Sequence, residues 1–304
     1  MTLPIVYHPD YMAPLRPGHR FPMSKYGYLR RALVRRGILP EAGGFIAPAP
    51  ATVWQVAGVH ALDYVERVAR QGILPDELRR IGLPNSAAVS RRAFLSAAGT
   101  LLAARLAMET GLACNMAGGS HHAGPEGGAG FCVFNDVAVA AQALLDEGHV
   151  RRVLVVDCDV HQGDGTARIF DGDARVMTLS LHAEKNYPVR KASSDLDFPL
   201  PDNLKDAPYL EMLDYALEQT SGFRPDIVFY NAGVDPHEVD RLGRLALSNE
   251  GLRARDARVI GFARDQGLPL VGVLGGGYDD DRDRLAERHA ILFEEAARRV
   301  DTAA

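Results

Sequence analysis

The chain has 304 residues, 47% of them hydrophobic and 24% charged, which is typical of a globular protein long enough for one large core or two modest ones. Its net charge of -5 provides no general basic field for phosphate groups, so we expect no direct nucleic acid binding. Three cysteines are too few for a disulfide framework, and we expect neither a signal peptide nor a membrane span, which predicts a cytoplasmic protein.

Short apolar runs rich in β-branched residues predict strands, and segments with helical periodicity lie between them. In chain order, the predicted elements are a strand at 5–7, helices at 24–36 and 91–109, a weaker strand at 113–116, a helix at 136–146, strands at 153–157 and 176–181, a helix at 209–219, a strand at 227–230, a helix at 250–266, a strand at 270–274 and a helix at 283–299. This alternation predicts an α/β fold in which helices cover both faces of a mainly parallel central sheet. No linker divides the chain, so we expect a single domain over residues 1–304.

Unusually polar or glycine-rich sequences follow five of the predicted strands. They read GGSHHAGPEGG after Met116, DCDVHQGDG after Val156, SLHAEKNYP after Thr178, NAGVDPHE after Tyr230 and GGGYDDD after Leu274. In parallel sheets of this kind, ligands bind beyond the carboxyl ends of the strands. We therefore expect the five loops to open on one rim and to build a single site.

The segment DCDVH carries Asp157, Asp159 and His161 at alternate positions. Alternate side chains of an extended segment point to the same side, so Asp159 and His161 can reach one metal ion. A third ligand must come from another strand end, and Asp235 in NAGVD is the best candidate. Such a set leaves coordination positions open and suits Zn²⁺, Fe²⁺ or another divalent ion. Alone, the pattern could equally be loop polarity, but five such strand ends together favour a site.

His121 and His122 are adjacent, and each needs a partner that fixes its tautomer. Asp157 and Asp164 are the carboxylates of DCDVHQGDG that the metal assignment leaves free. A carboxylate behind an imidazole orients the ring and raises its basicity. The many glycines around the histidine pair allow a ligand to approach the backbone closely.

The stretch LGGGYDDD permits three interpretations. Consecutive glycines can present N–H groups to a phosphate, but the Lys-Ser/Thr and the spaced GxGxxG of phosphate-binding loops are missing. Alternatively, the glycines let Tyr278 turn its phenol toward the rim and donate a hydrogen bond to an oxyanion. The third interpretation is a plain helix start with acidic residues in its first turn.

Taken in this order and at these intervals, the motifs GGSHHA, GFCVFND, VVDCDVHQGDGT, SLH, NAGVD and GGGY resemble those of the zinc-dependent histone deacetylase superfamily. That superfamily includes bacterial acetylpolyamine amidohydrolases and acetoin-utilisation proteins, and HRFPMSKY and NYPVRKASSDLD are most similar to the class IV and related bacterial branch. The resemblance covers nearly the whole chain. It implies an arginase/deacetylase-like fold and a metal-dependent amidohydrolase whose substrate is an acyl-lysine in a protein or peptide, or an acylated small amine.

The resemblance also implies roles for individual residues. The implied zinc ligands are Asp159, His161 and Asp235. The implied catalytic residues are His121 paired with Asp157, His122 paired with Asp164, and Tyr278. The implied substrate-channel residues are Gly130, Phe131 and Tyr187. The implied ligands of a structural potassium ion are Asp157, Asp159, His161, Ser180 and Leu181. Gln162 stands where many relatives have a further histidine, and we expect no loss of activity from this difference.

In the implied mechanism, zinc activates water and the acyl carbonyl, His122 is the general base, His121 is an electrostatic neighbour, and Tyr278 stabilises the oxyanion. Three alternatives stand beside an acyl-lysine deacylase: a hydrolase of acetylpolyamines or other small amides, an arginase-like binuclear manganese hydrolase, and an inactive acyl-lysine binding module. A second metal would need a further carboxylate where the NAGVD strand has Asn231. An inactive module would be expected to lack a ligand or the tyrosine, and the chain has all of them.

Overall fold

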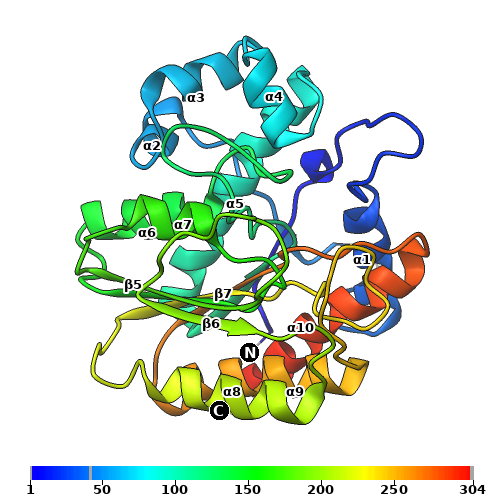
Figure 1. Cartoon of the computed structure of the whole chain (residues 1–304), viewed down its shortest axis with the longest axis vertical. Helices are drawn as coiled ribbons and strands as arrows, with labels where there is room; N and C mark the ends of the chain where they lie inside the picture. The colour runs from blue at the N-terminus through cyan, green and yellow to red at the C-terminus, as the bar shows by residue number, and fades with distance from the viewer. Residues whose placement is uncertain (1, 41–42, 302–304) are drawn as a thin grey trace.

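Eight parallel strands form one central sheet in the computed structural model, which describes residues 2–40 and 43–301 (Figure 1). The strands are β1 (Ile5–Val6), β2 (Phe45–Ile46), β3 (Leu112–Asn115), β4 (Val153–Asp157), β5 (Val176–Ala183), β6 (Leu196–Leu200), β7 (Ile227–Asn231) and β8 (Leu270–Val273). Their order across the sheet is β2-β1-β3-β8-β7-β4-β5-β6, and every neighbouring pair is parallel. All loops that follow the strands therefore leave the sheet at the same edge.

Strand β4 lies between β5 and β7, in the interior of the sheet. Val155 and Val156 face the two hydrophobic cores on opposite sides of the sheet, which is why the strand is apolar throughout. Its last residue, Asp157, is aligned with Ser180 of β5 and Asn231 of β7. The polar run thus begins where β4 and β7 end together, beside Ser180 in the longer strand β5.

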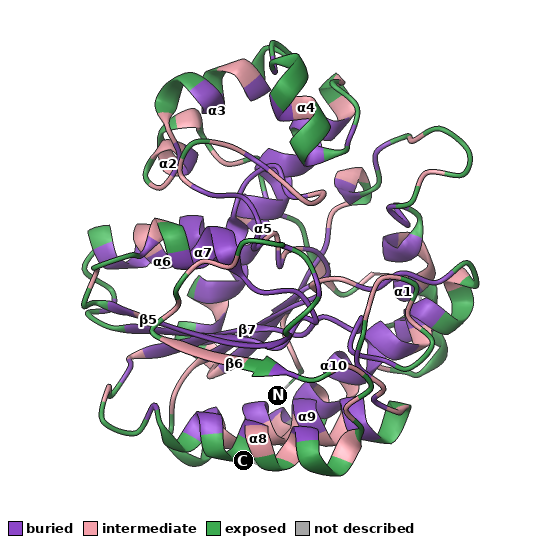
Figure 2. Cartoon of the chain, viewed as in Figure 1, coloured by how far each residue is buried: buried purple, intermediate pink, exposed green. Residues whose placement is uncertain are grey.

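Helices cover both faces of the sheet. The longer helices are α1 (Lys25–Arg35), α5 (Ala87–Thr110), α6 (Asp136–Asp146), α8 (Asp206–Glu218), α9 (Asn249–Asp265) and α10 (Arg282–Asp301). The shorter ones are the 3-10 helix η1 (Pro9–Tyr11), α2 (Val53–Ala57), α3 (Leu62–Ala69), α4 (Pro75–Ile81) and α7 (Asp164–Ile169). Figure 1 shows α5, α6 and α7 on one side of the sheet and α8, α9 and α10 on the other, with α2, α3 and α4 beyond α5. Burial is concentrated in the sheet and in the helix surfaces that face it (Figure 2).

The predicted fold class, a single α/β domain with a mainly parallel sheet, is confirmed, and every predicted strand is present. The two edge strands, β2 and β6, escaped prediction because β2 has two residues and β6 contains a proline, which only an edge strand tolerates. Helices α2, α3, α4 and α7 also escaped prediction, since segments of five to eight residues carry little periodicity. In the described part of the chain, none of the helices combines the length and apolarity that crossing a membrane requires.

Candidate active site

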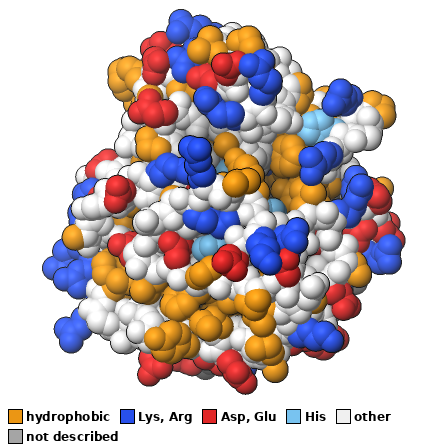
Figure 3. All heavy atoms as spheres, viewed as in Figure 1, with side chains coloured by type: hydrophobic (Ala, Val, Ile, Leu, Met, Phe, Trp, Pro, Cys, Tyr) orange, Lys and Arg blue, Asp and Glu red, His pale blue; other side chains and the backbone are white. Residues whose placement is uncertain are grey.

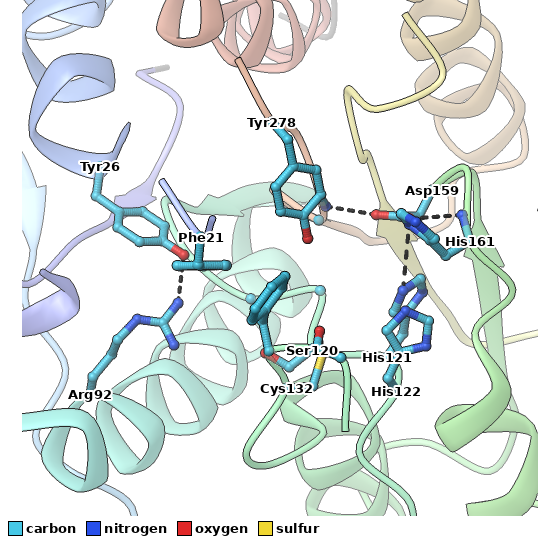
Figure 4. Close-up of a pocket in the computed structure, with 16 residues that line it drawn as sticks. Phe21, Tyr26, Arg92, Ser120, His121, His122, Cys132, Asp159, His161 and Tyr278 are labelled. Carbon is cyan, nitrogen blue, oxygen red and sulfur yellow. Dashed lines mark hydrogen bonds and ion pairs between the residues drawn. The ribbon is translucent and has the colours of Figure 1, made fainter. Parts of the chain in front are cut away.

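Two aspartates and a histidine from neighbouring strand ends lie together at the carboxyl edge of the sheet. Asp159 and His161 follow β4, and Asp235 follows β7. All three are buried, and one potential ligand atom from each lies within 4.8 Å of the other two. Figure 4 shows Asp159 and His161 across the cavity from Tyr278. Among residues 2–40 and 43–301, this is the only group of three or more His, Cys, Asp or Glu side chains with such geometry.

The donor atoms of this cluster fit a divalent cation. Oδ2 of Asp235 lies 3.2 Å from Nδ1 of His161 yet accepts no hydrogen bond from any described residue, although burying an unpaired carboxylate oxygen is costly. Oδ1 of Asp235 accepts the N–H of Val160 at 2.9 Å, which fixes the side chain. A Cβ on Gly276 would lie 2.0 Å from Oδ2 of Asp235, so this position must be glycine. An unpaired, oriented oxygen beside a carboxylate and an imidazole is the donor set of a catalytic metal site.

The charges within the cluster depend on one another. Burial lowers the pKa of His161, but the carboxylates of Asp159 and Asp235 outweigh burial and raise this pKa to about 10. Burial and the charge of Asp159 raise the pKa of Asp235. The pKa of Asp159 lies well below its usual range, because the imidazoles of His121 and His161 outweigh its burial. A metal-ligating imidazole is neutral, so a bound cation would replace the proton that His161 carries in the metal-free protein.

His121 and His122 each contact a carboxylate of their own. Nδ1 of His121 lies 2.7 Å from Oδ2 of Asp157, and Nδ1 of His122 lies 2.6 Å from Oδ1 of Asp164. These are the two pairings that the sequence motifs imply. Because a carboxylate accepts hydrogen bonds, each Nδ1 carries a proton and each Nε2 is left for other chemistry.

The two imidazoles differ in charge, although their ring centroids are only 4.1 Å apart. Burial lowers the pKa of His121, but Asp157 and Asp159 outweigh it and raise this pKa to about 9. Burial and the neighbouring charge of His121 lower the pKa of His122 to about 3, against the opposing effect of Asp164. In the metal-free protein at neutral pH, His121 is therefore a cation and His122 is a neutral base.

Tyr278 faces the cluster from the loop that follows β8 (Figure 4). Its ring is perpendicular to that of His161, with the centroids 6.5 Å apart. Burial and the charge of Asp235 raise the pKa of the phenol well above its usual value, so the hydroxyl stays protonated and can donate. The backbone N–H of Tyr278 donates a 2.6 Å hydrogen bond to Oδ2 of Asp240, which holds this loop in place.

The histone deacetylase domain family matches residues 19–293 of the chain. The chain belongs to the histone deacetylase family. An uncharacterized protein of Picosynechococcus sp. is 46% identical over 97% of this chain and 99% of that protein. Histone deacetylase 2 of Arabidopsis thaliana is 33% identical over 86% of this chain and 70% of that protein. The solved structure of an acetylpolyamine aminohydrolase from Burkholderia pseudomallei shares the fold, with a TM-score of 0.79, 23% identity and coverage of 96% of this chain and 98% of that one.

In this histone deacetylase family member, Gly130, Phe131 and Tyr187 border the approach to the cluster. Phe131 has a φ of 67°, a strained value for a bulky side chain, and its N–H donates to the carbonyl of Ile81 at 2.7 Å. A Cβ on Gly130 would lie 2.5 Å from the ring of His122, so the backbone there passes close to the imidazole. The ring of Tyr187 lies 4.8 Å from that of His122 and is 44% exposed, which places Tyr187 at the outer end.

The residues implied for a potassium site lie beside the cluster in this family member. Asp157 is aligned with Ser180 across β4 and β5, and Leu181 follows on β5. Oδ1 of Asp157 accepts the N–H of Asp159 and the Nδ2–H of Asn231, both at 3.0 Å. Asp157 therefore contacts His121 through one oxygen, and the loop after β4 and the end of β7 through the other. The potassium ion itself stays a prediction.

Two further residues of the site were not singled out in the sequence. Asp240 supports Tyr278 from the loop of residues 239–243, whose sequence is VDRLG. Lys25, in HRFPMSKY, is buried and its Nζ donates to the carbonyl of Gly275 at 3.0 Å. Burial, only partly opposed by Asp235, lowers the pKa of Lys25 to about 8. Lys25 lies within one of the family-like motifs and Asp240 lies close to another. Their burial depends on segments far away in the sequence, so the sequence alone does not reveal it.

Proposed function

We propose that the chain is a zinc-dependent deacylase that hydrolyses an acyl-lysine in a protein or peptide, or an acylated small amine. The observation that carries the proposal is the buried cluster of Asp159, His161 and Asp235, which faces the phenol of Tyr278. Membership of the histone deacetylase family supports the reaction class. One relative is named a histone deacetylase and one structural neighbour an acetylpolyamine aminohydrolase, and both names describe removal of an acyl group from an amine.

The three ligands would hold the metal with coordination positions left open. A divalent ion there would polarise the acyl carbonyl and lower the pKa of a water molecule. The neutral imidazole of His122 takes the proton of the attacking water on Nε2 and later gives it to the leaving amine. A protonated His121 would favour the negative charge that develops beside it.

The remaining side chains orient the acyl group. The phenol of Tyr278 donates its O–H to the oxyanion, which is where a fixed donor lowers the barrier most. Phe131 lines the approach and excludes water, and the carbonyl of Gly130 accepts the scissile N–H. Asp157 and Asp164 fix the tautomers of the two histidines. We further propose a structural potassium ion at Asp157, Asp159, His161, Ser180 and Leu181.

The arrangement favours one metal ion over the two of an arginase-like hydrolase. In the described ranges, a single metal-ligand cluster is present. Asn231, which stands where a second metal would need a carboxylate, donates its side-chain N–H to Oδ1 of Asp157. An inactive binding module is also less favoured, because the ligands, both histidine pairs and the tyrosine are all in place. An acetylpolyamine or another small amide remains an alternative substrate for the same chemistry.

A hydrolysis screen tests this proposal. The purified chain, loaded with Zn²⁺ or with Fe²⁺ under reducing conditions, is offered acetyl-lysine peptides, longer acyl-lysine peptides and acetylated polyamines. We expect turnover of at least one class, its loss on addition of a chelator, and its return when metal is restored. Failure of the folded, metal-loaded chain to hydrolyse any of these amides would contradict the proposal.

A further inference from the structure

A cavity outside the metal cluster forms the mouth of the site. It reaches from His122, His161 and Tyr278 past Phe131 to the surface, where Tyr187 borders it. Its remaining lining residues are Arg20, Arg80, Gly130, Asn186 and Leu242. Two arginines therefore face this cavity, whereas no aspartate or glutamate of the described ranges lines it. Figure 3 shows Lys and Arg side chains on several sides of a depression near the middle of the molecule.

These two arginines lack the partners that most exposed arginines of this chain have. Arg70, Arg168 and Arg241, for instance, form ion pairs with acidic side chains. In contrast, neither Arg20 nor Arg80 forms an ion pair or a side-chain hydrogen bond with any residue in the described part of the chain. In a chain whose net charge is -5, two unpaired guanidinium groups on one cavity are an uncompensated local positive charge.

The acidic residues near this mouth have cationic partners of their own. Glu77, whose charge interacts with that of Arg80, pairs with Arg67, and Asp164 contacts His122 and pairs with Arg168. Arg20 also borders a neighbouring cavity that Asp279 and Asp280 line. Asp279 accepts a 2.5 Å hydrogen bond from Nη2 of Arg288, and Asp280 pairs with Arg241. Each of these carboxylates therefore has a cationic partner other than Arg20 or Arg80.

The backbone around both arginines is fastened to the channel wall. The carbonyl of Arg80 accepts the N–H of Gly130 at 2.9 Å. On the other side, Nε2 of His19, which precedes Arg20, lies 3.1 Å from the carbonyl of Gly82, close behind Arg80. Both side chains thus project from backbone that is fixed relative to the cavity, so binding a ligand orders the two side chains but not the backbone that carries them.

We propose that Arg20 and Arg80 bind a carboxylate of the substrate, so that the preferred substrate is an acylated amine with an anionic group close to the scissile amide. A guanidinium presents paired N–H donors that match a carboxylate, and it stays charged at every physiological pH. The same charges repel a polycation such as a polyamine. This inference rests on the proposed function and specifies its substrate class. The carboxylate can belong to an acidic residue of a peptide or to the free carboxyl end of an acyl amino acid.

Paired substrates that differ only in this charge test the proposal. The peptide pair carries Glu or Gln beside acetyl-lysine, and the small-molecule pair is Nε-acetyl-lysine with a free or an amidated α-carboxyl group. Acetylputrescine serves as the cationic substrate. The quantity measured is the ratio of kcat/KM for the anionic substrate to kcat/KM for its neutral partner, in the wild type, Arg20→Gln, Arg80→Gln and the double variant. Arg79→Gln is the matched control, since Arg79 is the exposed neighbour on α4 and pairs with Asp76.

We expect the wild type to favour the anionic member of at least one pair by about three- to tenfold, as two partly solvated charge pairs would produce. The ratio should fall toward one in the double variant, decrease with rising salt, and stay at the wild-type value in Arg79→Gln. The pair that shows the preference identifies the source of the carboxylate. A ratio near one in the wild type, an unchanged ratio in the double variant, or a preference for acetylputrescine would overturn the proposal. Hydrolysis of the neutral substrates shows in each case that the proposed function itself holds.

Discussion

Asp240 holds the backbone of Tyr278, because the N–H of Tyr278 donates to Oδ2 of Asp240 at 2.6 Å. Oδ1 of the same carboxylate accepts the N–H groups of Leu242 and Gly243 at 2.8 and 3.0 Å. One side chain therefore joins the loop at the mouth of the site to the loop that carries the phenol. Asp240 is a positioning residue that acts through Tyr278.

The substitution Asp240→Asn tests this relationship, because it can turn an N–H donor toward the N–H of Tyr278. We expect kcat on an acyl-lysine peptide to fall about ten- to a hundredfold, as small displacements of a catalytic group do. In a Tyr278→Phe background the same change should cost much less, since the phenol is already absent. An undiminished loss in that background would mean that Asp240 acts only on general stability. Asp280→Asn, at an exposed carboxylate nearby, is the control.

Replacing Tyr278 by Phe removes only the hydroxyl that donates to the oxyanion. We expect kcat to fall about a hundred- to a thousandfold, which is the usual cost of losing one such donor. Bound metal, measured by elemental analysis, should stay at the wild-type level, because the phenol is not among the expected ligands. Wild-type turnover by a metal-loaded Tyr278→Phe variant would contradict the assignment.

The different protonation states of the two histidines, one charged and one neutral, predict unequal effects of their substitution. His122→Ala removes the neutral base and should lower kcat by about a hundred- to ten-thousandfold. His121→Ala removes a buried positive charge and should have a smaller effect on kcat. Single-turnover rates compare the two variants directly, since both rings are similarly buried and both contact a carboxylate. A larger loss in His121→Ala would reverse the two roles.

Much of the site could be predicted because its chemistry is local in sequence. The spacing of Asp159 and His161 predicted that both reach one metal from an extended segment; the segment bends instead, and the two side chains still meet in one cluster. The third member, Asp235, was predictable because parallel strands bring their carboxyl ends to one edge. Sequence motifs therefore suffice where a residue follows directly on a buried strand.

Other parts of the site depend on long-range packing. Lys25 begins a helix far from the sheet's polar edge in sequence, and only the fold places its Nζ on the carbonyl of Gly275. The mouth combines Arg20 from an N-terminal loop with Arg80 from α4, a helix too short to show a hydrophobic periodicity in the sequence. Such residues have no local pattern, because their partners lie in other elements of the chain.

The buried histidine His60 makes stability depend on pH. Its Nδ1 lies 2.8 Å from the carbonyl of Gly124 and its Nε2 accepts the N–H of Asn135 at 2.9 Å, so the native ring is neutral. Burial lowers its pKa to about 4, from the ordinary value of 6.5. Between about pH 6.5 and about pH 4, His60 is therefore protonated in the unfolded chain but not in the native chain. The free energy of unfolding decreases as the pH falls through this range.

Urea unfolding of the metal-free protein checks this pH dependence. Between about pH 7.5 and about pH 5, the wild type should lose about 2 kcal/mol more of its unfolding free energy than His60→Gln does. The variant should be less stable at the higher pH, because it fits the two hydrogen bonds of His60 less well. The same pH slope in both proteins would show that His60 does not titrate on unfolding.

The most direct test of the account is a titration of the metal-free chain with Zn²⁺ while hydrolysis of an acyl-amine substrate found in the screen is followed. One ion at Asp159, His161 and Asp235 predicts that the rate rises linearly and levels off at about one equivalent of metal per chain, and that Asp235→Asn shows no such rise. A rate that levels off only at about two equivalents, or one that does not respond to metal, would contradict a single-metal deacylase.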